Sequence, residues 1–135
     1  MVNGEEIAKT IESTEAWEQI CGENAIRDML FVVEVYAEWC GPSTAIWSSY
    51  VKMYHEYSDR KLKIMKVCAK LETDGHVLDK FLTGSRPNFL FYLNGEQVGH
   101  VEGVQVPAFE KAIADHLPEG LVEGAFDAAQ EEEED

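Results

Sequence analysis

The feature that most constrains the fold is an almost unbroken apolar run at residues 29–36, rich in β-branched and aromatic side chains. Such a run is typical of a central β-strand that is covered on both faces. It leads into residues 37–43, which contain Cys40 and precede a segment with Ile46, Tyr50 and Tyr54 at helical spacing. Open α/β sheets build their sites where such strands end and helices begin. The sequence therefore predicts an α/β fold with a cysteine at a site-forming edge.

Strand and helix patterns alternate along the rest of the chain. We expect strands at residues 7–11, 29–36, 62–68, 88–93 and 97–101, and helices after Ser13, after Pro42, at residues 77–82 and from Pro107. Asn94-Gly95 lies between the last two strands and is a strong signal for a tight hairpin. The order β-α-β-α-β-α-β-β-α predicts a mixed central sheet with helices on both faces.

Composition and charge narrow the class of protein. The chain has 135 residues, 45% of them hydrophobic, which suits one compact domain. Its formal charge of −15 argues against binding to nucleic acid or to an anionic membrane surface. The sequence has no apolar run of membrane-spanning length, and its first residues lack the pattern of a signal peptide. With three cysteines, an odd number, the pattern favours a reducing, cytoplasmic setting.

The acidic residues are concentrated at one end. Residues 118–135 contain eight acidic side chains and no basic one. A segment with this composition repels itself and buries little apolar surface, so we expect a disordered acidic tail. The folded domain is accordingly expected at residues 1–117.

Cys40 is the candidate nucleophile. At the junction of strand and helix, its sulfur faces unpaired N–H groups and the positive end of the helix dipole. Both stabilise the thiolate, which is the reactive form of cysteine. Ser43 lies three residues further on, within reach to donate a hydrogen bond to that thiolate. Cys21 and Cys68 are expected to be small packed residues.

Several motifs, in the same order, resemble those of the thioredoxin family. Residues 38–42 (Glu-Trp-Cys-Gly-Pro) match the family's active-site loop, and residues 33–36 match its central strand. Arg86-Pro87 before residues 89–95 is similar to the family's cis-proline loop and hairpin, and Gly103 stands where the family has a glycine beside the site. The resemblance spans residues 5–117 and implies the thioredoxin fold.

The departures from the family pattern bear on function. Ser43 stands where the family has a second cysteine, and a hydroxyl cannot resolve the mixed disulfide that the first thiolate forms. Dithiol turnover is therefore excluded unless Cys21 or Cys68 reaches Cys40. Glu34 stands where the family has a buried acid that assists the second cysteine, and here we expect only a hydrogen-bonded structural acid.

The surface around this loop is a candidate for docking a peptide. Arg86 replaces the small or apolar residue that commonly precedes the family's proline, which places a cation beside the groove. The candidate patch consists of Trp39, Pro42, Arg86, Pro87, Gly103 and Val104.

Simpler interpretations stay open for the same residues. In these interpretations, Cys40 is held by packing alone and has no catalytic role, and Pro87 only shapes its loop. The tyrosines of the helix after Pro42 then belong to the core rather than to an interface. The histidines lack the spacing of zinc ligands, and no phosphate-binding loop is present, so we expect no metal and no cofactor.

Two functions are compatible with these features. The chain is similar to the thioredoxin-like light chains of axonemal outer-arm dynein, which implies a binding subunit at the tail of a dynein heavy chain in the axoneme of a cilium or flagellum. In that role Cys40 holds a partner through a redox-sensitive mixed disulfide or is not used. The alternative is a monothiol oxidoreductase in which Cys40 attacks disulfides and glutathione regenerates it.

Overall fold

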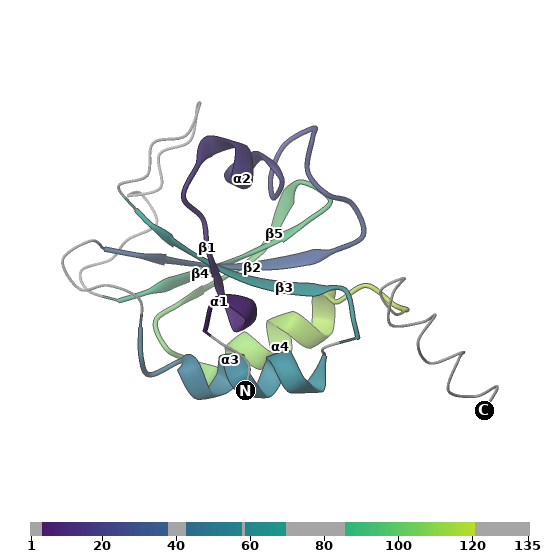
Figure 1. The fold of residues 1–135 in the computed structure, drawn as a ribbon. Coiled ribbons are helices and arrows are strands. Elements are labelled where there is room, and N and C mark those ends of the chain that lie inside the picture. Colours follow the sequence, from purple (N-terminus) through teal and green to yellow (C-terminus); the bar gives the residue numbers. More distant parts are fainter. Residues whose placement is uncertain (1–3, 38–42, 58, 70–85, 121–135) are drawn as a thin grey trace.

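The computed structural model describes residues 4–37, 43–57, 59–69 and 86–120. Within these residues, five strands form one sheet in the order β1-β3-β2-β4-β5 (Figure 1). The strands are β1 (Lys9–Thr10), β2 (Leu30–Tyr36), β3 (Leu62–Cys68), β4 (Asn88–Leu93) and β5 (Glu96–Glu102). The helices are α1 (Gly4–Ile7), α2 (Thr14–Glu18), α3 (Trp47–Glu56) and α4 (Val106–His116).

Strand β2 occupies the centre of the sheet, as its apolar run predicts. It pairs in parallel with β3, where Leu30 is opposite Leu62 and Tyr36 is opposite Cys68. On its other side it pairs antiparallel with β4. All residues of β2 except Tyr36 are buried. The mixed sheet and its hairpin of β4 and β5 are therefore confirmed.

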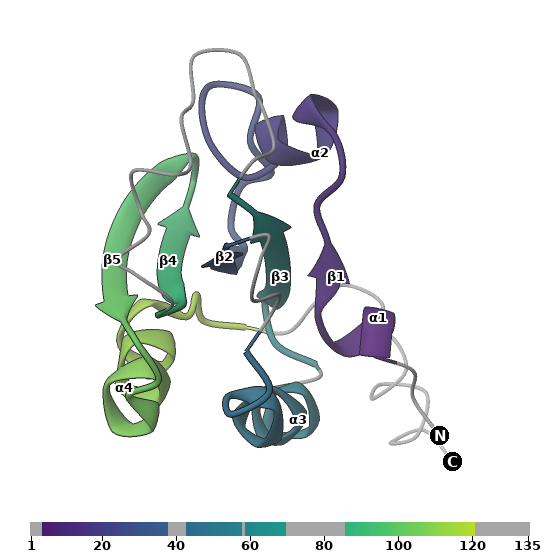
Figure 2. The ribbon, with the colours of Figure 1, turned by 90° about the vertical axis from the view of Figure 1, so that its left-hand side faces the viewer.

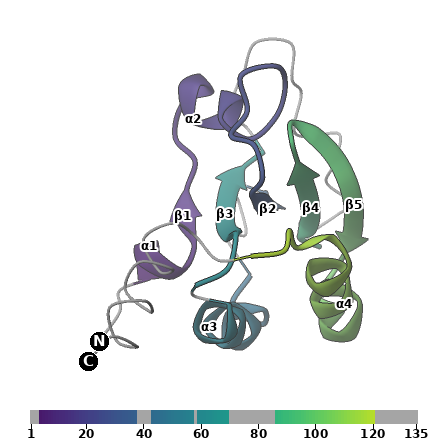
Figure 3. The ribbon, with the colours of Figure 1, turned by 90° about the vertical axis from the view of Figure 1, so that its right-hand side faces the viewer.

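The sheet separates two apolar layers. Helices α3 and α4 cover one face and α2 covers the other (Figures 2 and 3). Side chains of β2 alternate between them, so Leu30 and Val32 join the core beneath α3 and α4 while Phe31 and Val33 pack with Trp17 of α2. Glu34 has the parity of Leu30 and Val32, so it points into the layer of α3 and α4.

The N-terminal segment differs from the predicted strand at residues 7–11. Residues Gly4–Ile7 form the short helix α1, and only Lys9–Thr10 form a strand. Ile7 and Ala8 are both buried in the same apolar core. Adjacent side chains of a strand point to opposite faces, so two consecutive residues of one core require a turn of the chain here.

Helices α2 and α3 also differ in extent from the predicted helices. Ser13 caps α2 as expected, with its hydroxyl accepting from the Ala16 N–H at 3.1 Å, but α2 ends at Glu18, before the stop near Gly22 that the sequence predicts. Helix α3 begins at Trp47, later than the position directly after Pro42. In the segment before this helix, the Ser43 N–H donates to the Glu34 carboxylate. The helix expected at residues 77–82 lies outside the described residues.

The hairpin turn is confirmed in detail. Asn94 and Gly95 have φ values of 53° and 84°, the left-handed conformations that a tight primed turn requires. Gly95 lies against the end of the α2 region, where its carbonyl accepts from the Gly22 N–H at 3.0 Å. A Cβ added at Gly95 would stand 2.3 Å from the Gly22 oxygen. Only glycine fits this contact.

Candidate functional site

The structure describes only part of the site that the sequence predicts. Trp39, Cys40 and Pro42 lie outside the residues that the structure describes. The remaining members of the predicted set are described: Glu34, Ser43, Arg86, Pro87, Gly103 and Val104. The structure brings Glu34 to Ser43, and Pro87 to Gly103.

Glu34 forms the buried centre of this region. Its side chain is fully buried on β2, and both carboxylate oxygens accept a hydrogen bond. Oε1 accepts from the Tyr50 hydroxyl at 2.6 Å, and Oε2 accepts from the Ser43 N–H at 2.7 Å. The carboxylate thus joins the central strand to helix α3 and to the segment that precedes this helix.

Electrostatics show why this carboxylate needs both donors. Burial raises the pKa of Glu34 above its ordinary range, while the hydrogen bonds from Tyr50 and Ser43 and the charge of Lys66 act in the opposite direction. The pKa of the Tyr50 hydroxyl is also raised, by burial first and then by the charge and hydrogen bond of Glu34. Tyr50 therefore keeps its proton and serves as a permanent donor to Glu34.

The contribution of Tyr50 goes beyond the sequence prediction, which assigned the tyrosines of this helix to the core or to an interface. Tyr50 belongs to the core, since its side chain is 1% exposed, but its hydroxyl also partners the buried acid. A signal was present in the sequence. A buried acid in an apolar strand needs donors, and Tyr50 carries an O–H on the inward stripe of the next helix.

A second part of the site lies where β4 begins and β5 ends. The Gly103 N–H donates to the Pro87 carbonyl at 2.8 Å, and Gly103 has a φ of +77°, which favours glycine. The described residues contain no cis peptide bond, so the Arg86–Pro87 bond, whose isomer the sequence leaves open, is trans in this structure. Val104, next to this contact, is one of the exposed large apolar residues.

Arg86 is exposed, and its charge is partly matched. Its Nη1 lies 3.3 Å from Oε1 of Glu102 on β5. Both side chains are accessible to water, so this ion pair contributes little to stability. The guanidinium nevertheless stands beside the Pro87–Gly103 contact, because Gly103 lies next to the Arg86 side chain. Arg86 thus places a positive charge beside Pro87 and Gly103, and the docking patch itself stays a prediction.

Asn88 and His100 form a polar contact that the sequence prediction missed. The Asn88 side chain is 1% exposed, and its Oδ1 lies 2.6 Å from Nε2 of His100 on the neighbouring strand. The Asn88 amide therefore has a partner despite its burial.

Within the described residues, no group of three His, Cys, Asp or Glu side chains is arranged to hold a metal ion. No helix among these residues is long and apolar enough to cross a membrane.

The fold and the sequence together define the class of protein. The family model described as Thioredoxin matches residues 8–116, and the chain therefore belongs to the thioredoxin family. Among solved structures, thioredoxin from Trypanosoma brucei brucei is similar, with a TM-score of 0.60 and 26% identity over 80% of this chain and 88% of that one.

Two curated proteins are similar to this chain. The chain is 35% identical over 86 residues to the dynein 14 kDa light chain of the flagellar outer arm from Chlamydomonas reinhardtii, covering 64% of each protein. It is 36% identical over 108 residues to thioredoxin domain-containing protein 6 from Homo sapiens, covering 79% of this chain and 30% of that one. The chain thus spans less than two thirds of the length of these relatives.

Proposed function

We propose that this chain is a light-chain subunit of a flagellar outer-arm dynein complex, and that it acts by binding rather than by dithiol turnover. The similarity to the Chlamydomonas light chain supports the choice of complex. The acidic charge and the thioredoxin domain are compatible with a protein partner. We place the partner contact on the tail of a dynein heavy chain, and the protein in the axoneme of a cilium or flagellum.

The observation that carries the binding role is the use of the Glu34 carboxylate. Turnover of a dithiol needs a second thiol, and Ser43 occupies that position. Dithiol turnover also benefits from an acid that exchanges protons with the second thiol. Both oxygens of Glu34 are instead engaged, one by the Tyr50 hydroxyl and one by the Ser43 backbone. The acid therefore fastens the fold in a chain that has no resolving thiol at residue 43.

The proposed contact surface is the patch predicted from the sequence: Trp39, Pro42, Arg86, Pro87, Gly103 and Val104. Its described members combine an exposed cation, Arg86, with an exposed apolar side chain, Val104. Such a surface suits an extended peptide that carries both acidic and apolar residues. Cys40 adds a covalent mode: its thiolate attacks a disulfide of the partner, one sulfur of that disulfide leaves as a thiolate, and an outside thiol later attacks the resulting mixed disulfide and releases Cys40. We assign residues 1–117 to the binding domain and residues 118–135 to the acidic tail.

A capture experiment with the full chain tests this proposal. Wild type and Cys40→Ser are used as baits in a salt extract of motile cilia, each with and without dithiothreitol. The retained proteins are identified by mass spectrometry, and the mixture is sedimented to see whether the bait moves with the outer-arm dynein particle. We expect both baits to retain the same heavy chain under both conditions.

A different pattern would contradict the binding role. If partners are retained only by intact Cys40 and are lost on reduction, the thiol is the working group and the monothiol oxidoreductase becomes the better assignment. Ser43→Ala is the matched control, because it keeps the backbone N–H that Glu34 uses and removes only the hydroxyl. Loss of capture in this control would show that the Ser43 side chain itself contributes to binding.

A further inference from the structure

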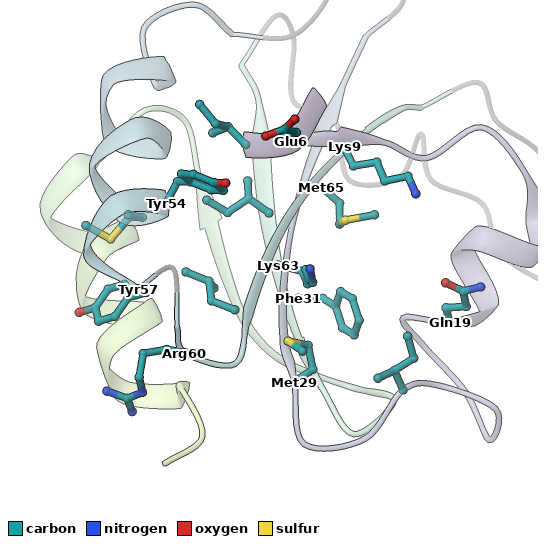
Figure 4. A pocket seen from close by; sticks show the side chains of 15 residues that line it. Glu6, Lys9, Gln19, Met29, Phe31, Tyr54, Tyr57, Arg60, Lys63 and Met65 are labelled. Carbon is teal, nitrogen blue, oxygen red and sulfur yellow. The ribbon is translucent and has the colours of Figure 1, made fainter. Parts of the chain in front are cut away.

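A groove runs along the outer edge of β3, away from the candidate site. Its volume is about 610 Å³, and residues of α1, α3 and β3 are among those that line it (Figure 4). The groove exists because β1 is short: Lys9 and Thr10 pair only with Met65 and Lys66. Among the described residues, the earlier half of β3 therefore has no strand beside its outer edge.

The lining of this groove combines an apolar surface with positive charge. Tyr54 of α3 and Tyr57, which directly follows this helix, form one side, and Met29, Phe31 and Met65 lie across from them (Figure 4). Methionine and aromatic side chains of this kind adapt to an apolar peptide.

The charge of the lining is unusual for this protein. Lys9, Arg60 and Lys63 line the groove, whereas Glu6 is the one acidic residue of the lining. Lys9 and Lys63 are exposed. In a chain with a formal charge of −15, a local excess of cations favours an acidic occupant.

Arg60 connects the groove to one particular acidic segment. Its side chain lines the groove, and it also donates to the Gly120 carbonyl at 3.0 Å and to the Pro118 carbonyl at 3.1 Å. The described part of the chain therefore ends, at Gly120, beside the groove. The segment 121–135 contains seven acidic residues and no basic one, together with the apolar side chains Leu121, Val122 and Phe126. Fully extended, a segment of this length spans about 50 Å, which is enough to cross a domain of this size.

We propose that residues 121–135 bind in this groove of the same molecule. Leu121, Val122 and Phe126 cover the methionine and aromatic surface, and the acidic residues lie against Lys9 and Lys63. Tethering makes such a contact effective even when it is weak. At an effective concentration of about 1 mM, a segment with a dissociation constant of about 0.1 mM fills the groove about nine-tenths of the time. A partner with a similar acidic and apolar segment must displace the tail.

Zero-length cross-linking of the full chain tests the charged part of the contact. Carbodiimide treatment at low protein concentration, followed by mass spectrometry, is expected to join Lys9 or Lys63 to acids of residues 121–135 within one molecule. Lys111 is the matched control, because it is an exposed lysine on α4, outside the groove. The double variant Lys9→Glu with Lys63→Glu should weaken the contact between the tail and the groove. Replacing the acids of residues 131–135 by lysine in that variant should restore the contact, now with cross-links between the new glutamates and the new lysines.

Methionine oxidation tests the apolar part. Hydrogen peroxide converts accessible methionine to the sulfoxide, and a tail that fills the groove nine-tenths of the time slows this reaction about tenfold. We expect Phe126→Ser to accelerate oxidation of Met29 and Met65 in the full chain, while Val104→Ser, which removes an exposed apolar side chain outside the groove, leaves it unchanged. Met53 also lines the groove but is only 2% exposed, so it stays protected unless the fold itself has loosened.

Three results would overturn the proposal. Tail acids that cross-link to Lys111 as often as to Lys9 and Lys63 would show a tail without a preferred surface. Cross-linked dimers in place of internally linked monomers would show that a second copy supplies the segment. Equal oxidation rates for wild type and Phe126→Ser, with Met53 protected in both, would show an open groove.

Discussion

The substitution Tyr50→Phe isolates the hydroxyl that binds the buried carboxylate. The ring keeps its place against Phe109, whose centroid lies 5.9 Å away, so packing changes little. What is lost is the 2.6 Å hydrogen bond to Oε1 of Glu34. A hydrogen bond to a charged group contributes about 1.5–3 kcal/mol, and a neutral one about 0.5–1.5 kcal/mol. We therefore expect the free energy of unfolding to fall by about 2 kcal/mol at pH 7.

The loss should shrink in acid, and its sign follows from the pKa of Glu34. Burial raises this pKa above the ordinary value of 4.5, so the folded state binds the proton more tightly than the unfolded state. The cost of the buried charge is present above the folded pKa and disappears as the pH falls toward 4.5. Tyr50 acts against that cost, because its hydrogen bond lowers the pKa. Without Tyr50 the cost is larger, and so is the gain on protonation.

Urea denaturation at pH 7 and at pH 5, followed by tryptophan fluorescence, measures both quantities. Tyr54→Phe is the matched control, because it makes the same change one turn later on α3, where the side chain is only partly buried. We expect Tyr54→Phe to shift the unfolding free energy by less than about 0.5 kcal/mol at either pH. A Tyr50→Phe loss that is equally small, or that grows as the pH falls, would refute the role of the Tyr50 hydroxyl as the donor that stabilises the Glu34 carboxylate.

Three further predictions, each with its own control variant, concern Gly95, Ser43 and Ser13. Gly95→Ala places a Cβ 2.3 Å from the Gly22 oxygen and should cost well over 1 kcal/mol in thermal unfolding, whereas Gly22→Ala, with a similar φ but open space around it, should cost only about 1 kcal/mol. Equal losses would contradict the close contact. Ser43→Cys is expected to gain insulin-reducing turnover with Cys40, and a similar gain in Ser43→Ala would show that a second thiol is not the missing part. Ser13→Ala should lower the unfolding free energy by about 1 kcal/mol, because the cap bond to Ala16 is lost, and Ser13→Asp should retain most of it.

The sheet was predictable because its signals are local. The run at residues 29–36 carries its own evidence of burial on both faces, and β3 and β4 have the bounds that their sequence patterns predict. Asn94-Gly95 predicts its turn because few other residue pairs adopt two left-handed conformations in succession. Membership of the thioredoxin family follows from the same local motifs, read in order.

Features that depend on distant contacts were not predictable in this way. The hydrogen bond between Ser43 and Glu34, in the segment before α3, joins two residues that are nine apart in the sequence. The helix α1 follows from the need to bury Ile7 and Ala8 in one core. The groove follows from the shortness of β1, and the contacts of Arg60 with Pro118 and Gly120 link residues far apart in the sequence. Periodicity does not report such pairings.

The contacts of Glu34 also show that the architecture around this carboxylate does not depend on a thiol at residue 43. Ser43 contributes its backbone N–H to the carboxylate, and every amino acid except proline offers that donor. Tyr50 supplies the second donor from the helix itself. Neither contact requires a sulfur atom at residue 43, so the fold around the buried acid is independent of whether a second thiol is present. Stability and dithiol chemistry are thus separable at this position. In their reduced forms, Ser43→Cys and Ser43→Ala should therefore unfold at the same urea concentration, within error. Only Ser43→Cys can form an internal disulfide with Cys40 once it is oxidised. A difference between the two reduced variants would mean that the side chain, and not only the backbone, supports the Glu34 network.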